Sequence, residues 1–348
     1  MKSSIKILMV LLTVWVPFLG FSQGCTDADP NQRLKVFGFI QPEYHANFSE
    51  GGENTFVFNR ARLGATGSIP YDFQYYVVAE LSPSFTGNPY LLDAFISYNR
   101  FSWAKAAVGQ FKSPFSLELQ TPCHKLNTIY RSHVVVELAS PLRDMGLTIF
   151  GGNDTTKIKY QVGIMNGVGL NNADDNGGKD FVGRLLFQPF GAKKILAVGG
   201  SFRYGTAKPQ DATATTQDTH LRYGFEANFK MKNFTLQGEY IYGNDEGSYT
   251  TGGGCGGPGT VVQGSIERQG WYFTAMYMTK FRLQPVVKYE YFDSDLSKTD
   301  QFKYITTLGV NYFFNDWTRL QANYLLVNSQ AGEDKLNNQL LLQLQVVF

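Results

Sequence analysis

The sequence lacks the repeated apolar runs of about 20 residues that a membrane protein built of several helices needs. Charged residues make up only 17% of its 348 positions, below the roughly 25% of ordinary soluble domains. Its 13 prolines and 36 glycines follow no strict period, which excludes a collagen-like chain. The 31 basic and 29 acidic residues nearly cancel, so the composition gives no basic stripe for nucleic acid.

The first residues read as an export signal. Lys2 and Lys6 precede an apolar run over 7–19 and a small residue at Ser22, which is the order of a secretory signal peptide. We predict cleavage after Ser22, so that residues 1–22 are removed and 23–348 form the mature protein.

Cysteine is scarce, with only Cys25, Cys123 and Cys255. No Cys-x-x-Cys or Cys/His spacing indicates a metal site. An exported chain meets an oxidising compartment, in which Cys123 and Cys255 can pair or stay unpaired. A lipoprotein interpretation would instead place a lipid on Cys25, although the residues before it fit that motif poorly.

From residue 33 onward the polar and apolar residues alternate. In the final segment Leu340, Leu342, Leu344 and Val346 alternate with glutamines, which is the pattern of a strand with one apolar and one polar face. The period predicts sixteen strands, at 33–47, 54–69, 72–82, 90–100, 104–112, 143–151, 156–166, 179–189, 194–205, 218–230, 233–243, 264–279, 281–293, 300–314, 316–328 and 335–348.

The connections between these strands alternate between short turns and long segments, the latter at 113–142, 167–178, 206–217 and 244–263. Short turns at one end, long loops at the other and an even number of strands are typical of an all-β, outer-membrane β-barrel. Phe348 suits a closing strand that the barrel-assembly machinery recognises. A secreted soluble β-sandwich also alternates, but its outer faces would carry more charge than these strands do.

With the apolar faces toward lipid, the opposite parity lines the lumen. Its basic excess favours anions, and the loops and turns are then expected to be acidic. The alternative is that the wall charges pair across strands and only hydrate the wall. The basic residues are Lys35, Arg60, Arg62, Lys112, Lys157, Lys159, Arg184, Arg203, Arg222, Lys288, Lys303 and Arg319, and the acidic ones are Glu43, Glu80, Asp93, Asp144, Glu226, Glu239 and Glu290.

The segment 113–142 is the longest stretch without alternation, and it contains Lys125 and Arg131. Such a long structureless segment in a barrel is either an exposed loop or one folded inward. The apolar residues at 134–136 and Leu138 favour packing against something. We therefore predict an inward fold that constricts the pore.

Four short motifs stand in order between residues 58 and 152: Phe58-Asn59-Arg60-Ala61-Arg62-Leu63-Gly64, Leu92-Asp93-Ala94-Phe95, Gly109-Gln110-Phe111-Lys112-Ser113-Pro114-Phe115 and Arg143-Asp144-Met145-Gly146. Together they resemble the phosphate-selective porin O and P family of Gram-negative outer membranes, and the exported start resembles Bacteroidota proteins. The resemblance implies a sixteen-stranded passive channel, often trimeric, for small anions such as phosphate. Its surroundings would be outer-membrane lipid and lipopolysaccharide.

The candidate pore-lining or anion-binding residues come from two sources. The family motifs carry over Arg60, Arg62, Lys112, Arg131 and Arg143, and the wall and loop patterns add Lys125, Arg184, Arg203 and Arg222. Few arginines lie in the long loop, so a general diffusion porin is the alternative. A barrel enzyme such as a phospholipase would need a Ser–His pair at a lipid-facing edge, and none emerges. We expect no catalytic residues, metal or cofactor.

Overall fold

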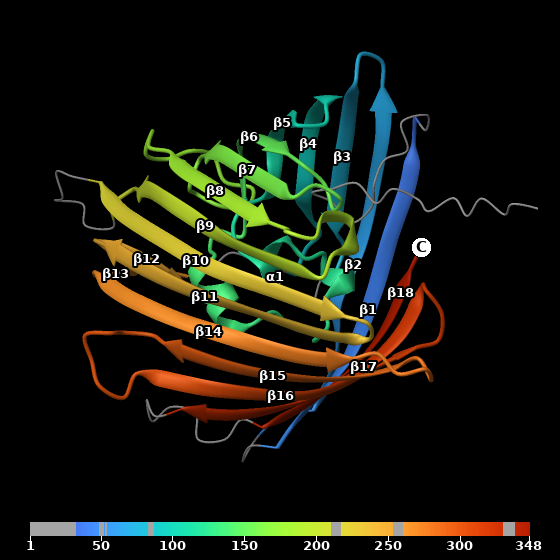
Figure 1. Ribbon diagram of the computed structural model, residues 1–348. Helices are drawn as coiled ribbons and strands as arrows, with labels where there is room; N and C mark the ends of the chain where they lie inside the picture. Colours follow the sequence, from blue (N-terminus) through green and yellow to red (C-terminus); the bar gives the residue numbers. More distant parts are fainter. Residues whose placement is uncertain are drawn as a thin grey trace, which may run out of the picture.

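A computed structural model describes residues 33–48, 52, 54–82, 87–209, 217–252, 260–329 and 338–348. Sixteen antiparallel strands form a closed barrel, in which β1 pairs with β18 (Figure 1). The predicted fold class is therefore confirmed. The predicted signal peptide at 1–22, Cys25 and Cys255 lie outside the described residues.

The barrel strands follow the predicted boundaries closely. They are β1 (Lys35–Asn47), β2 (Thr55–Ile69), β3 (Phe73–Glu80), β4 (Tyr90–Phe101), β5 (Ala104–Lys112), β6 (Arg143–Gly151), β7 (Ile158–Met165), β8 (Asp180–Phe187), β9 (Leu196–Ala207), β10 (Asp218–Met231), β11 (Phe234–Glu246), β14 (Ile266–Tyr277), β15 (Leu283–Asp293), β16 (Phe302–Phe313), β17 (Thr318–Ser329) and β18 (Gln339–Val347).

Alternation along each strand separates the two faces of the barrel wall. On β18 Leu342 and Leu344 are exposed on the outside, whereas the side chains of Gln343 and Gln345 are buried in the interior. Successive side chains of a strand point to opposite faces, and a membrane makes the outer face apolar. Within the described part of the chain, no helix is long and apolar enough to cross a membrane.

The connections segregate to the two ends of the barrel. At one end lie short turns, at 70–72, 102–103, 152–157, 188–195, 232–233, 278–282 and 314–317. The long connections at the other end include 247–265, which contains a separate hairpin of β12 (Ser248–Thr251) and β13 (Thr260–Gln263). The sequence predicted only a loop there. Short turns mark the periplasmic end of such barrels.

The predicted acidic excess holds for the long loops but is wrong for the short turns. The turns carry six basic residues, Lys157, Lys193, Lys194, Lys232, Lys280 and Arg282, against three acidic ones, Asp72, Asp154 and Asp316. Basic residues are tolerated at these positions because the turns lie outside the apolar layer. The periplasmic rim is therefore positive.

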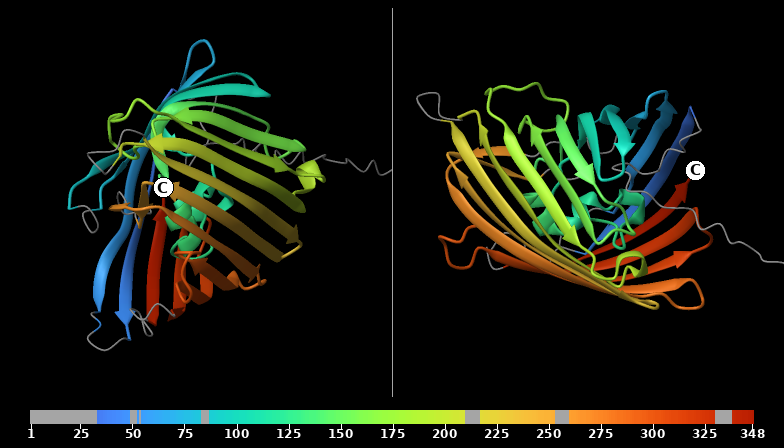
Figure 2. Two further views of the ribbon diagram at one scale, coloured as in Figure 1. Left: turned by 90° about the vertical axis from the view of Figure 1, so that its left-hand side faces the viewer. Right: turned by 45° about the horizontal axis from the view of Figure 1, so that its top comes forward.

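The segment 113–142, here called the inward loop, folds into the barrel. It contains α1 (Leu117–Gln120), a 3₁₀ turn η1 (Cys123–Lys125) and α2 (His133–Leu138). Figure 2 shows these helical turns inside the ring of strands. The predicted inward fold of this segment is confirmed.

Closure of the barrel depends on a close contact between β1 and the end of the chain. Gly38 and Phe348 exchange two backbone hydrogen bonds of 2.9 Å. A Cβ at Gly38 would lie 2.6 Å from the carbonyl oxygen of Arg62 and 2.7 Å from the ring of Phe348. Glycine is therefore required at this position for the two edge strands to meet.

We expect the substitution Gly38→Val to destabilise the closed barrel by about 1–3 kcal/mol, the usual cost of overpacking. The unfolding temperature in detergent, followed by circular dichroism, checks this. Ala61→Val is the matched control, because Ala61 lies opposite Ile40 on the neighbouring strand β2. Equal unfolding temperatures for the two variants would contradict the role of Gly38.

Candidate functional site

The inward loop is held first by a carboxylate on the opposite wall. Glu239 of β11 accepts hydrogen bonds from the Ser116 hydroxyl and the Leu117 backbone N–H, both at 3.0 Å. The Ser116 hydroxyl in turn accepts from the Leu119 N–H at 3.2 Å. The first turn of α1 is thus capped partly by its own serine and partly by the barrel wall.

The second helix of the inward loop is fixed in the same way. Glu290 of β15 accepts from the His133 N–H at 2.6 Å, and Glu118 accepts from the Ser132 N–H at 2.5 Å. The side chains of Val134 and Leu138 are fully buried in the cluster of apolar residues that α2 forms with the wall. This packing explains why the apolar residues of 134–138 interrupt an otherwise polar lumen.

The middle of the inward loop lies on the wall formed by β1 and β15–β18. Arg319 donates to the Leu126 carbonyl at 2.9 Å, and Asn311 donates to the Asn127 carbonyl at the same distance. The Ile129 N–H donates to the side chain of Asn323 at 2.8 Å. The inward loop therefore contacts the barrel wall on both sides of the lumen.

The lumen wall is divided into two parts with different chemistry. On β2–β11, apart from Arg60, the candidate arginines form ion pairs with buried carboxylates, as low-dielectric surroundings require. The pairs are Arg62–Glu80 (2.8 Å), Arg143–Asp93 (3.0 Å), Arg184–Glu226 (2.6 Å), Arg203–Asp180 (3.6 Å) and Arg222–Asp245 (2.6 Å).

On the other part, amide side chains replace carboxylates. Arg60 donates to Gln41 at 2.8 Å, Gln41 donates to Gln345 at 2.7 Å, and Arg319 donates to Gln345 at 3.0 Å. The exposed fractions of Arg60 and Arg319 are 1% and 5%. Across the described residues, neither arginine has a carboxylate within ion-pair distance, and the Nε of each lacks a hydrogen-bond partner. We call Arg60, Gln41, Gln345 and Arg319 the arginine–glutamine row.

The remaining candidates support the inward loop. Lys112 donates to the Thr121 carbonyl at 3.1 Å, and Arg131 donates to the carbonyls of Glu118 and Thr121 at 3.0 and 2.8 Å. Lys125 is exposed on the inward loop. Three of the predicted residues therefore lie on the loop or beside it, and two of these three hold its backbone.

The buried part of the wall is nearly neutral. Of the predicted wall cations, Lys35 and Lys303 share the parity of the lumen side but are only partly buried, and Lys157 lies on a turn. Buried strand residues comprise eleven basic and ten acidic side chains, an excess of one. The basic ones are Arg60, Arg62, Lys112, Arg143, Lys159, Arg184, Arg203, Arg222, Arg268, Lys288 and Arg319, and the acidic ones are Glu43, Glu80, Asp93, Asp144, Asp180, Asp218, Glu226, Glu239, Asp245 and Glu290.

Sequence reasoning missed Arg268, although the signal was present. It shares the parity of the buried residues Tyr272 and Thr274 on β14, so the period of two places it in the lumen. Arg268 pairs with Asp245 at 2.9 Å and lies 3.6 Å from Glu137 of the inward loop. Its guanidinium also lies 5.0 Å from the ring centroid of Tyr249.

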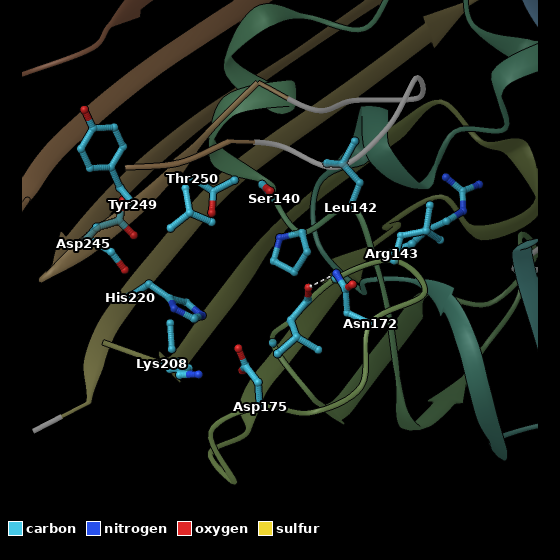
Figure 3. Close-up of a pocket in the computed structure, with 18 of the residues that line it drawn as sticks. Ser140, Leu142, Arg143, Asn172, Asp175, Lys208, His220, Asp245, Tyr249 and Thr250 are labelled. Atoms are coloured by element: carbon cyan, nitrogen blue, oxygen red, sulfur yellow. Dashed lines mark hydrogen bonds between the residues drawn. The ribbon is translucent and has the colours of Figure 1, made fainter. Parts of the chain in front are cut away.

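A cavity of about 530 Å³ opens at the loop end of the lumen (Figure 3). Arg143, Lys208, His220 and Arg222 contribute basic groups to its lining, and Asp175 and Asp245 contribute carboxylates. The volume is within the range of small-molecule sites. In the described part of the chain, no group of three or more His, Cys, Asp or Glu side chains is arranged to hold a metal ion.

This architecture, a closed barrel with an inward loop and a polar lumen, defines the class of outer-membrane porins. A family model for the phosphate-selective porin O and P family matches residues 43–348, and the chain belongs to that family. It is an outer-membrane porin of the Gram-negative type. The comparison with curated proteins finds no match.

Solved porins share the fold at low sequence identity. The chain is similar to Salmonella typhi OmpF in complex with daunomycin, at 13% identity and a TM-score of 0.69 over 91% of this chain and 98% of that one. It is similar to an anion-selective porin from Comamonas acidovorans at 12% identity and a TM-score of 0.66, over 91% of this chain and 100% of that one. It is similar to the trimer form of Vibrio cholerae OmpT at 14% identity and a TM-score of 0.66, over 92% of this chain and 100% of that one.

Two histidines of the inward loop are held neutral. Burial lowers the pKa of His133 from 6.5 to about 3, with a smaller contribution from Lys303. Burial, with Lys125 nearby, lowers the pKa of His124 from 6.5 to about 4. In an undocked loop both histidines would become protonated below pH 6.5, whereas in the docked loop they stay neutral to a lower pH.

We therefore expect docking of the inward loop to weaken as the pH falls from 6.5 toward 4, because protonation favours the undocked state. Single-channel current noise at pH 7.5 and 4.5 measures this. In the variant His124→Gln/His133→Gln, the current noise at pH 4.5 should differ much less from the noise at pH 7.5. Noise that rises equally at low pH in both proteins would assign the effect to other groups.

Proposed function

We propose that this porin is a passive channel for small hydrophilic solutes with a preference for anions. The observation that carries the proposal is the arginine–glutamine row. A carboxylate cancels most of the field of a paired arginine, whereas Arg60 and Arg319 have amide neighbours. Both side chains are buried, so they act on an ion in the lumen through their field and not by direct contact. Lys125, exposed on the inward loop, adds a third cation.

The position of these cations supports selection at the narrow part of the lumen. Arg319 donates to the Leu126 carbonyl and Gln345 donates to the His124 carbonyl at 3.2 Å, so the row lies directly against the inward loop. Charges near a constriction determine selectivity more strongly than charges at a wide mouth. We therefore assign anion preference to Arg60, Arg319 and Lys125, and a scaffold role to the paired arginines.

Phosphate is the specific anion that the family name suggests for this chain. Unpaired guanidinium groups suit phosphate because they offer several donors in a planar arrangement. A general diffusion porin is the alternative, and it would show no competition between phosphate and chloride.

We propose no catalytic activity. A barrel phospholipase would need a histidine at a lipid-facing edge beside a serine. His124 and His133 lie in the inward loop, His45 contacts Tyr130 of that loop at 3.2 Å, and His220 contacts the buried Asp180 at 2.9 Å. All four histidines of the chain thus have interior positions.

We further propose that the barrel assembles as a homotrimer in outer-membrane lipid and lipopolysaccharide. The trimer form of the similar Vibrio cholerae OmpT supports this assembly. Phe348 is proposed as the residue that the barrel-assembly machinery recognises, because it directly follows the closing strand β18 and is half-exposed.

Charge reversal tests the assignment of selectivity. Reversing a charge about 8 Å from an ion in water changes their interaction energy by about 1 kcal/mol. We therefore expect Arg60→Glu and Arg319→Glu each to lower the anion-to-cation permeability ratio roughly fivefold. Reversal potentials in a salt gradient across a planar bilayer measure the ratio. Millimolar phosphate should also reduce the chloride current of the unmodified protein, and less so that of Arg319→Glu.

The matched control is the double variant Arg184→Gln/Glu226→Gln, which removes a paired arginine together with its carboxylate. It leaves the net wall charge unchanged and should keep the permeability ratio. If this control shifts selectivity as much as Arg319→Glu does, the division between paired and unpaired arginines has no functional meaning.

Native mass spectrometry from mild detergent tests the assembly, with three chains per particle as the expected stoichiometry. A protein that is monomeric both in detergent and after cross-linking in membranes would rule out the trimer.

A further inference from the structure

Five basic residues at the periplasmic end form a continuous cluster, here called the basic arc. Lys193, Lys230, Lys232, Lys280 and Arg282 lie on or beside three turns, 188–195, 232–233 and 278–282. These turns join six strands that are consecutive neighbours in the barrel, from β8 to β15. With a strand spacing of about 4.8 Å, the arc extends roughly 24 Å across the strands.

The nearest acidic turn residues to the basic arc are Asp154 and Asp316, on the turns that flank it. The three turns and Lys230 include no aspartate or glutamate, and within the described ranges none of the five side chains forms an ion pair. Two other basic residues at this end are paired, because Arg100 lies 3.3 Å from Asp72 and Lys194 lies 2.7 Å from Asp154. The charge of the arc is therefore available to an external anion.

Exposed apolar side chains alternate with these cations. Phe281, between Lys280 and Arg282, is 80% exposed, and Met231, between Lys230 and Lys232, is 56% exposed. Phe190 is also half-exposed on the first of the three turns. Such a mixture is unfavourable in water but suits the membrane interface, where apolar rings enter the acyl region and basic groups stay at headgroup level.

One cation of the arc is held in place by the fold. Arg282 donates to the carbonyl of Phe314 on the adjacent turn at 2.6 Å. Its guanidinium is therefore fixed over the gap between two turns, next to the exposed side chains of Phe314 and Phe281. A fixed guanidinium beside exposed rings is a geometry that a phosphate headgroup with acyl chains would fill.

We propose that the basic arc binds the phosphate groups of anionic phospholipids in the inner leaflet of the outer membrane. This binding is separate from transport, since the paired and unpaired lumen arginines play no part in it. The occupant is a lipid rather than free phosphate, because the apolar anchors would be unused by a small ion. Each basic residue near an anionic surface contributes about 1 kcal/mol, or roughly a fivefold change in affinity.

The test measures how many phosphatidylglycerol molecules the folded barrel retains from mixed micelles that also contain phosphatidylcholine, by native mass spectrometry. We expect the unmodified protein to prefer phosphatidylglycerol. Each of Lys232→Gln, Lys280→Gln and Arg282→Gln should lower that affinity about fivefold, and the variant with all five residues changed to Gln should show no preference. Phe281→Ala should weaken retention without changing the charge.

The matched control changes Lys179, Lys208 and Lys298 of the long loops to Gln, which removes charge from the opposite end of the barrel. It should retain phosphatidylglycerol as the unmodified protein does. The proposal is overturned if the unmodified protein does not distinguish the two lipids, or if the control and the five-residue variant lose retention equally. It is also overturned if inorganic phosphate at equal concentration displaces the lipid, because the arc would then be a site for free phosphate.

Discussion

Closure of the sheet between β1 and β18 is the constraint on which the rest of the structure depends. In a membrane every backbone N–H and C=O needs a partner, so a sheet with open edges cannot span it. Closing sixteen strands encloses a lumen wider than the wall side chains can fill. The inward loop occupies much of that space, and it can do so because Glu239, Glu290 and Glu118 accept its backbone N–H groups.

The same burial determines how the lumen carries charge. Arginines enclosed by the wall and the inward loop need carboxylates nearby, and most of them have one, which leaves the buried part of the wall with almost no net charge. In the arginine–glutamine row, by contrast, amides take the place of acids beside Arg60 and Arg319. A near-neutral lumen can therefore still prefer anions, because selectivity depends on which cations lack a counter-charge rather than on the total.

The strands were largely predictable because water on one side and lipid on the other impose a period of two. The predicted strand at 33–47 became Lys35–Asn47, and the inward fold of 113–142 followed from the apolar residues near Val134. Which charged residues pair with one another was harder to predict from the sequence. Arg62 and Glu80 are direct neighbours in the register, but Arg184 reaches Glu226 two strands away, across Gly199 of β9. The position of a residue in the alternating pattern predicts the face of the wall on which it lies. It does not predict which residue of that face becomes its ion-pair partner.

The reversal potential of the unmodified channel in a tenfold potassium chloride gradient tests the central claim most directly. We expect a potential of the sign set by chloride, since among the described residues Arg60, Arg319 and Lys125 lie near the inward loop without a carboxylate at ion-pair distance. A potential of the sign set by potassium would contradict it, because the remaining buried charges of the wall nearly cancel.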